Sequence, residues 1–186
     1  MPQLTVIVID MQRRLLAGDG SPDFGAAHRV PQVVEGINRL TAAARAAGAP
    51  VCFVQHEGEG LANGTAGWQL HEGLETDLAG DWFLEKRVGD AFQDTSLKSR
   101  LDAAGVTRLL VCGYASQYCV DTTARRAALL GFETTVVADL HTTQPQGSLS
   151  AADIIAHRNE VWATSSLSGN RIAVRELADI MTKEFA

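Results

Sequence analysis

The sequence predicts a single α/β domain with a three-layer, Rossmann-like fold, in which a mostly parallel sheet is covered by helices on both faces. Short apolar runs rich in β-branched residues alternate with segments of helical spacing, a pattern typical of repeated βαβ units. The first run, residues 4–9, is a continuous run rich in β-branched residues, as expected for a strand that is buried on both faces. The length of 186 residues fits one domain, so we expect residues 1–186 to form one unit without a linker.

The elements after the first strand follow from local signals. Pro31 suits the first turn of a helix that stops before Gly48. Ser150, with Asp153 three residues later, is typical of a helix start. The six strands that we predict cover residues 4–9, 50–56, 82–86, 107–112, 133–138 and 161–164. The helices that we predict cover residues 31–47, 97–104, 116–130, 150–159 and 170–182. Residues 57–80 are rich in Gly and lack periodicity, which indicates a long loop or flap of the kind that is often functional.

Composition excludes several classes of function. The net charge is −6 and no run of Lys and Arg exceeds two residues, so a nucleic-acid surface is not expected. No apolar run approaches the roughly 18 residues of a membrane-spanning helix, and residues 1–10 lack the basic segment of a signal peptide. Three cysteines cannot form a closed disulfide framework, which favours a reducing, cytoplasmic location. The first strand is not followed by Gly-x-Gly-x-x-Gly, which argues against a dinucleotide-dependent oxidoreductase.

Three side chains that could do chemistry lie where predicted strands end. Ligands of open parallel sheets bind at the carboxyl ends of the strands. Asp10 follows the first strand, Lys86 ends the third, and Cys119 follows the fourth at the start of a helix. Each has a simpler interpretation: a turn residue, a solvated charge and a buried structural thiol. Together they offer a carboxylate, an ammonium and a thiol at one sheet edge, which is a set suited to nucleophilic catalysis.

The position of Cys119 at a helix start carries two further expectations. The positive end of the helix dipole and free backbone N–H groups favour a thiolate, which predicts a pKa below the usual value of about 8.5. The same N–H groups are suited to hold the negative oxygen of a tetrahedral intermediate.

Three blocks of the sequence resemble the isochorismatase-like cysteine hydrolases, a superfamily that includes nicotinamidases, carbamoylsarcosine amidohydrolases and ureido-amide hydrolases. They are Val-Ile-Asp-Met-Gln at 8–12, Glu-Lys-Arg at 85–87 and Cys-Gly-Tyr-Ala-Ser-Gln-Tyr-Cys-Val-Asp-Thr-Thr at 112–123. The segment Ala-Asp-Leu-His-Thr-Thr at 138–143 also matches, and its His141 and Thr142 are interpreted as supporting the fold or an interface. The resemblance implies a sheet of order 3-2-1-4-5-6 and a homodimer or homotetramer.

The resemblance also implies roles for individual positions. Asp10 matches the general base of the family, Lys86 its catalytic lysine and Cys119 its nucleophile. The bond between Tyr114 and Ala115 matches a cis peptide, and the N–H groups of Ala115 and Cys119 match the oxyanion hole. The expected function is hydrolysis of a small-molecule amide or ureide C–N bond through a thioester, without a cofactor. The alternatives are isochorismatase-type hydrolysis of another small metabolite, or a non-catalytic domain of the same fold that binds a small molecule or a partner.

One departure from the family bears on metal binding. Nicotinamidases carry Asp-x-His and a distal His after the second strand, whereas residues 54–59 here read Val-Gln-His-Glu-Gly-Glu. A metal ion needs several converging ligands, so we predict no metal site and doubt nicotinamidase activity. His56 and His71 are then interpreted as hydrogen-bonding or pocket-wall residues.

Four residues are candidates for contact with a substrate: Gln12, His56, Trp68 and Tyr118. Trp68 lies in the Gly-rich stretch, where an aromatic ring could cover a substrate. The alternative for Trp68 is a core contact under the loop.

Overall fold

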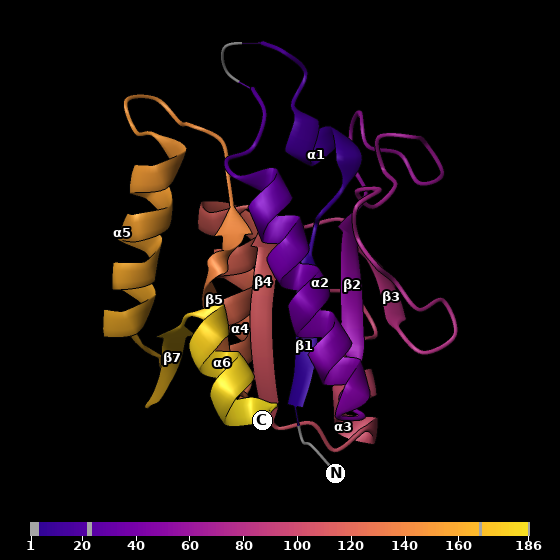
Figure 1. Cartoon of the computed structure of the whole chain (residues 1–186), viewed down its shortest axis with the longest axis vertical. Helices are drawn as coiled ribbons and strands as arrows, with labels where there is room; N and C mark the ends of the chain where they lie inside the picture. The colour runs from indigo at the N-terminus through magenta and orange to yellow at the C-terminus, as the bar shows by residue number, and fades with distance from the viewer. Residues whose placement is uncertain (1–3, 22–23, 168, 186) are drawn as a thin grey trace.

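A seven-stranded sheet forms the centre of the computed structural model, which describes residues 4–21, 24–167 and 169–185 (Figure 1). Residues 1–3, 22–23, 168 and 186 of the domain predicted over 1–186 lie outside the described residues. The strands are β1 (Leu4–Ile9), β2 (Val51–His56), β3 (Trp82–Lys86), β4 (Arg108–Tyr114), β5 (Glu133–Thr142), β6 (Ser166–Leu167) and β7 (Asn170–Arg175). Their order is β3-β2-β1-β4-β5-β7-β6, and only the β6–β7 pair among the described strands is antiparallel. The mostly parallel α/β fold and the order of its first five strands are thereby confirmed.

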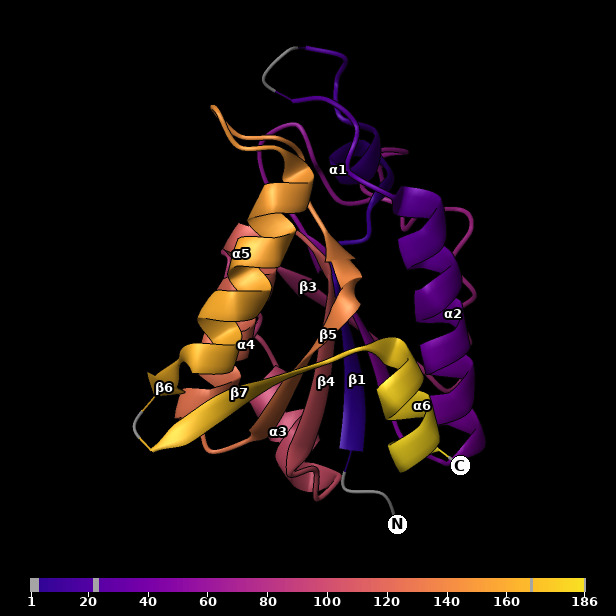
Figure 2. The same cartoon turned by 60° about the vertical axis from the view of Figure 1, so that its left-hand side comes forward.

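Helices cover both faces of the sheet, which confirms the three layers (Figure 2). One face carries α2 (Val30–Ala46) and α6 (Leu177–Glu184), and the other carries α3 (Leu97–Ala103), α4 (Asp121–Leu129) and α5 (Ala151–Thr164). The short α1 (Arg13–Ala17) lies above the sheet in Figure 1, and a π-helical turn, η1 (Ser116–Val120), connects β4 to α4. Among the described residues, no helix combines the length and the apolar character needed to cross a bilayer.

The central strand β1 shows why the sheet needs both layers. Val6 and Val8 belong to the core shared with α2, whereas Ile7 and Ile9 belong to the core on the opposite face. Side chains alternate between the faces of a strand, so a strand with helices on both sides is mostly apolar on both faces. All six residues of β1 are buried.

The predictions for the C-terminal part are wrong in two places. Residues 161–164, predicted as a strand, extend α5, because Trp162 is fully buried there and donates its indole N–H to Asp121 Oδ1 at 2.7 Å. Residues 170–175, predicted as part of a helix, form β7, which pairs with β5 and buries Ile172. The sheet therefore has seven strands rather than six, and its order ends 5-7-6.

The strand β5 is longer than the predicted 133–138 and contains an irregularity. Val136 lies opposite Val111 of β4, but the next aligned pair is His141 with Gly113. Two positions along β4 thus correspond to five along β5, so β5 bulges at this point. The bulge places His141 beside the end of β4. The predicted helix over 116–130 is likewise divided into η1 and α4.

Residues 57–80 form a loop without helices or strands, as predicted. Backbone hydrogen bonds attach it to the segment that follows β1. The N–H of His71 donates to the carbonyl of Met11 at 2.8 Å, and the N–H of Arg14 donates to the carbonyl of Gly67 at 3.0 Å.

Candidate active site

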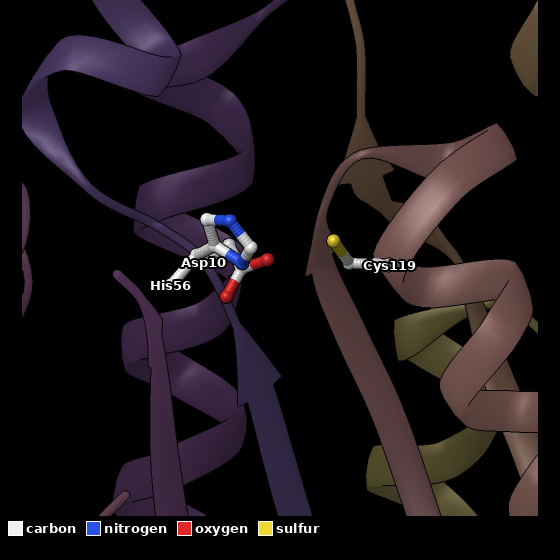
Figure 3. A group of neighbouring side chains, drawn as sticks. All are labelled: Asp10, His56 and Cys119. Carbon is white, nitrogen blue, oxygen red and sulfur yellow. The ribbon is translucent and has the colours of Figure 1, made fainter. Parts of the chain in front are cut away.

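Four adjacent strands bring four functional side chains to one edge of the sheet. Asp10 directly follows β1, His56 ends β2, Lys86 ends β3, and Cys119 lies in η1 after β4. The carboxyl ends of parallel neighbours meet at the same edge, so residues far apart in the sequence become neighbours. Figure 3 shows Asp10, His56 and Cys119 around a common space, with the sulfur facing the carboxylate. The structure therefore brings together the three residues predicted for catalysis, with His56 beside them.

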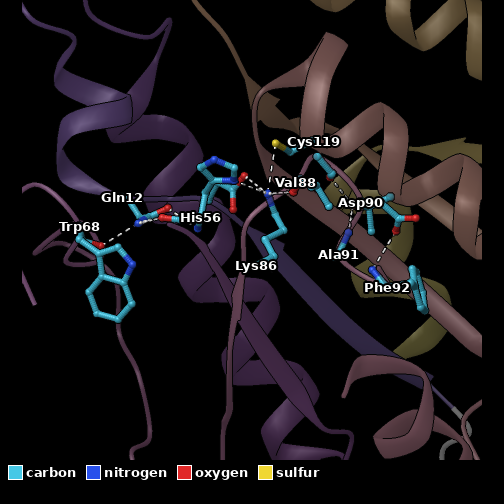
Figure 4. Close-up of polar contacts among 12 residues, drawn as sticks. Gln12, His56, Trp68, Lys86, Val88, Asp90, Ala91, Phe92 and Cys119 are labelled. Atoms are coloured by element: carbon cyan, nitrogen blue, oxygen red, sulfur yellow. Dashed lines mark hydrogen bonds and ion pairs between the residues drawn. The ribbon is translucent and has the colours of Figure 1, made fainter. Parts of the chain in front are cut away.

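The ammonium of Lys86 lies at the centre of this cluster (Figure 4). Lys86 Nζ donates to Asp10 Oδ2 at 2.7 Å, to the Val88 carbonyl at 3.1 Å and to Cys119 Sγ at 3.2 Å. His56 Nδ1 lies 3.3 Å from the same nitrogen. The Lys86 and Asp10 side chains are almost completely buried, so this ion pair is shielded from solvent. Because an ammonium has three N–H groups, its four neighbours compete for them and hold it in place.

Burial and charge set the protonation of the Cys119 thiol. Burial and the nearby Asp10 carboxylate raise the pKa of the Cys119 thiol to about 12, and Lys86 only partly offsets this. Burial also raises the pKa of Asp10, with Lys86 acting in the opposite direction. The prediction that the helix start lowers the pKa of Cys119 is therefore wrong, because desolvation and an adjacent full charge outweigh the partial charge of a helix end. The thiol keeps its proton at neutral pH and needs a base.

The backbone of Asp10 is held in an unusual conformation. Its φ of 50° lies in the left-handed region, which few residues other than Gly, Asn and Asp adopt. Its N–H donates to the Val54 carbonyl, and its carbonyl accepts from the N–H of Gln12, both at 2.8 Å. Oδ1 of the carboxylate is buried and has no hydrogen-bond partner among the described residues. That oxygen is therefore free to take a proton at the site.

The turn that carries Cys119 begins with a close contact between strands. Gly113 has a φ of +116°, and a Cβ atom there would lie 2.1 Å from the Ile9 carbonyl oxygen, so only glycine fits. The peptide bond between Tyr114 and Ala115 is cis. The Ala115 carbonyl then accepts from the N–H groups of Tyr118 at 3.0 Å and Val120 at 3.3 Å, which starts η1. Cys119 thus lies in the first helical turn, between two residues whose N–H groups bond to the Ala115 carbonyl.

The other candidate contact residues lie in different surroundings. Gln12 is fully buried, and its amide bonds to both backbone groups of His56 and to the Trp68 carbonyl. Figure 4 shows the Trp68 ring on the side of Gln12 away from Cys119. Tyr118 is 51% exposed, and its hydroxyl accepts a hydrogen bond from Gln146. The structure thus brings neither the amide of Gln12 nor the ring of Trp68 to the sulfur.

Asp10, His56 and Cys119 also offer ligand atoms that lie within 4.8 Å of one another, a spacing compatible with a metal ion. Lys86 Nζ lies within 3.3 Å of an atom of each residue, so its positive charge already takes the position of a cation. His71 is used elsewhere, since its Nδ1 accepts from the N–H of Gly73 at 3.1 Å. The absence of a metal site stays a prediction that this arrangement favours.

Two parts of the site were not identified from the sequence. The Val88 carbonyl contacts Lys86, but every residue has a backbone carbonyl, so the sequence does not indicate this contact. Ser116, next to the nucleophile turn, bonds to His141 at 2.8 Å. The segment containing His141 matches the family, but no local sequence pattern indicates that the bulge of β5 brings His141 to Ser116.

Comparisons with known proteins show which family the chain is similar to. The isochorismatase domain model matches residues 5–164. A streptothricin hydrolase of Streptomyces noursei is 38% identical over 144 residues, which cover 74% of this chain and 49% of that protein. The chain thus spans about half the length of this relative. The ureidoacrylate amidohydrolase RutB of Pseudomonas syringae is 29% identical, with coverage of 81% and 75%. The crystal structure of an isochorismatase from Pseudomonas putida superposes with a TM-score of 0.83 at 32% identity, covering 95% of this chain and 89% of that one.

Proposed function

Because this chain belongs to the isochorismatase family, we propose that it is a cysteine hydrolase that cleaves a C–N bond of a small amide or ureide through a thioester on Cys119. The observation that carries the proposal is the position of Lys86 Nζ, 2.7 Å from Asp10 Oδ2 and 3.2 Å from Cys119 Sγ. Relatives named streptothricin hydrolase and ureidoacrylate amidohydrolase support hydrolysis of such compounds.

The first half of the reaction forms the thioester. Asp10 takes the proton of the Cys119 thiol, and the sulfur attacks the carbonyl carbon of the substrate. The raised pKa of Asp10 makes it a stronger base than an ordinary aspartate, which suits transfer from a thiol of high pKa. The N–H groups of Ala115 and Cys119 bind the negative oxygen of the tetrahedral intermediate. The C–N bond then breaks, and Asp10 returns the proton to the leaving nitrogen.

The second half releases the acid. Asp10 takes a proton from a water molecule, whose oxygen attacks the thioester carbonyl. The C–S bond breaks, and the sulfur regains the proton from Asp10 as the acid departs. Lys86 stays protonated throughout: it orients the carboxylate and stabilises negative charge on the sulfur. His56, whose pKa is lowered by burial and by Lys86, is neutral and accepts from the ammonium through Nδ1.

The proposal is tested with a panel of small amides, ureides and lactams that carry neutral, acidic or basic substituents. Released ammonia or amine is measured, and intact-protein mass spectrometry detects an acyl adduct on Cys119. We expect turnover of at least one compound, with a transient adduct that is absent from Cys119→Ala. Hydrolysis without an adduct and with full activity in Cys119→Ala would contradict the mechanism. Binding without turnover across the panel would favour a non-catalytic domain.

A further inference from the structure

A second row of polar side chains lies buried next to the nucleophile turn, and no step above uses it. Ser116 Oγ lies 2.8 Å from His141 Nδ1, and His141 Nε2 lies 2.9 Å from Asn159 Oδ1. The amide of Asn159 donates to the Ala138 carbonyl at 3.1 Å. Ser116 and His141 have no exposed surface.

The direction of each hydrogen bond in this row follows from the bond between Asn159 and the Ala138 carbonyl at its end. The Ala138 carbonyl can only accept, so the NH₂ group of Asn159 faces it and Oδ1 faces His141. His141 Nε2 must then carry a proton, which leaves Nδ1 as an acceptor. Ser116 therefore donates its hydroxyl proton to His141. The ring is neutral, because burial lowers the pKa of His141 to about 4.

The fold places these residues with little freedom. The bulge in β5 aligns His141 with Gly113, the residue at which the turn begins. The imidazole is held at both nitrogens, and its centre lies 5.1 Å from the Trp162 ring in an edge-on contact. Ser116 directly follows Ala115 and is the first residue of η1, which carries Cys119.

We propose that Ser116, His141 and Asn159 are positioning residues that fix the turn between β4 and α4, so that the Ala115 N–H and the Cys119 sulfur address the same carbonyl group. This inference rests on the proposed function. Ser116, His141 and Asn159 should then affect the step that forms the tetrahedral oxyanion, because that step depends on where the N–H donors lie. They should not affect the nucleophilicity of the sulfur itself.

Two reactions of Cys119 separate these effects. Acetylation by p-nitrophenyl acetate forms the S–C bond through a tetrahedral oxyanion, breaks the ester C–O bond and releases p-nitrophenolate, while the thiol proton passes to Asp10 and then to solvent. Alkylation by iodoacetamide displaces iodide without an oxyanion. The ratio of the acetylation rate to the alkylation rate at Cys119, followed by intact-protein mass spectrometry, therefore reports placement of the oxyanion donors.

The variants are chosen by which nitrogen of the ring they replace. His141→Asn places an acceptor where Nδ1 was, whereas His141→Gln reaches only the position of Nε2. We expect Ser116→Ala and His141→Gln to lower the rate ratio about tenfold, since small displacements of catalytic groups are costly. We expect His141→Asn to retain more of the ratio than His141→Gln. The exposed His157 of α5 supplies the matched control, His157→Gln.

The outcomes distinguish this inference from the proposed function. An unchanged ratio in Ser116→Ala and His141→Gln overturns the positioning role and leaves the hydrolase intact. If His141→Asn and His141→Gln lose the same fraction of the acetylation rate and the alkylation rate falls in parallel, the role of His141 is merely structural, and the positioning role is overturned too. If wild-type Cys119 is not acetylated and no amide is cleaved, the proposed function fails first. Where the buried variants do not fold, the partly exposed Asn159→Ala carries the test, with a smaller loss of the ratio expected.

Discussion

Gly113 approaches Ile9 so closely that a Cβ atom at residue 113 would lie 2.1 Å from the Ile9 carbonyl oxygen. This contact joins the ends of β1 and β4 at the point where one strand leads to Asp10 and the other to the turn of Cys119. Asp10 and Cys119, the proposed base and nucleophile, are therefore placed relative to each other by backbone contact, before any side chain is considered.

Gly113→Ala is expected to lower the free energy of unfolding by about 3 kcal/mol or more, because it combines a positive φ with a clash against backbone. Gly105→Ala is the matched control: its φ is +65°, but nothing lies within 4 Å of the added methyl group. There we expect a loss of about 1 kcal/mol. Urea unfolding measures both values, and equal losses would show that the contact with Ile9 is not restrictive.

Breaking the buried Lys86–Asp10 pair is expected to destabilise the fold more than removing it completely. Lys86→Met or Asp10→Asn alone leaves one uncompensated charge in the interior, at a cost of about 3 kcal/mol at pH 7. The double variant should recover most of this stability. Hydrolysis should fall at least a hundredfold in all three proteins, because Asp10→Asn removes the proposed base and Lys86→Met removes the cation that orients it. The double variant should therefore regain stability without regaining activity.

The exposed pair Lys98–Asp102 is the control for this cycle, and its disruption should change stability by about 0.5 kcal/mol or less. Additive losses in the double variant at Lys86 and Asp10 would contradict the buried ion pair.

Cys119 is expected to react with iodoacetamide before the other two cysteines, because Cys52 and Cys112 are fully buried and Cys119 is partly exposed. Between pH 6 and 9 its rate should rise about tenfold per pH unit, since the thiol pKa is about 12. Asp10→Asn removes a charge that raises this pKa, so alkylation at pH 8 should become faster while hydrolysis is lost. Peptide mapping shows which cysteines are alkylated, and mass spectrometry measures the alkylation rate at each pH. An alkylation rate that levels off below pH 8 would indicate a preformed thiolate.

Buried His141 should make stability depend on pH. The pKa of His141 is about 4 in the folded chain against an ordinary value of 6.5, so the unfolded chain binds the extra proton first as the pH falls. The contribution of neutral His141 is complete above pH 6.5 and is lost as the pH falls towards 4, by about 3 kcal/mol in total. Desolvation dominates this shift, with the charge of Arg29 acting in the same direction and Asn159 and Asp139 opposing it.

Urea unfolding of wild type and His141→Asn between pH 7 and pH 4.5 checks the slope. Parallel curves for the two proteins would show that His141 is not the titrating group.

The fold was predictable where residue pattern and burial agree. The buried run of β1, rich in β-branched residues, identifies a central strand, and the ends of β1, β3 and β4 identify Asp10, Lys86 and Cys119 as neighbours. The region after residue 160 was not predictable, because a short apolar run fits a helix or a strand equally well. Trp162 continues α5 only because its indole meets Asp121 of α4, a tertiary contact.

The site was predictable in its residue types and less so in its electrostatics. The helix start suggested an acidic thiol at Cys119, whereas its pKa depends on the closeness of Asp10 and on burial, which no local pattern encodes. The backbone position of Trp68 likewise depends on Gln12 and Gln55, which both donate to its carbonyl.

The loop between β2 and β3 is attached to the segment after β1 through main-chain groups, as in the Arg14–Gly67 and His71–Met11 hydrogen bonds. Such attachment depends little on side-chain identity, and Asp10, Lys86 and Cys119 all lie outside the loop. Substitutions within the loop can therefore change the side chains that it presents while Asp10, Lys86 and Cys119 stay in place. A chain of this fold can in this way come to accept a different small molecule while the residues proposed to cleave the bond stay where they are.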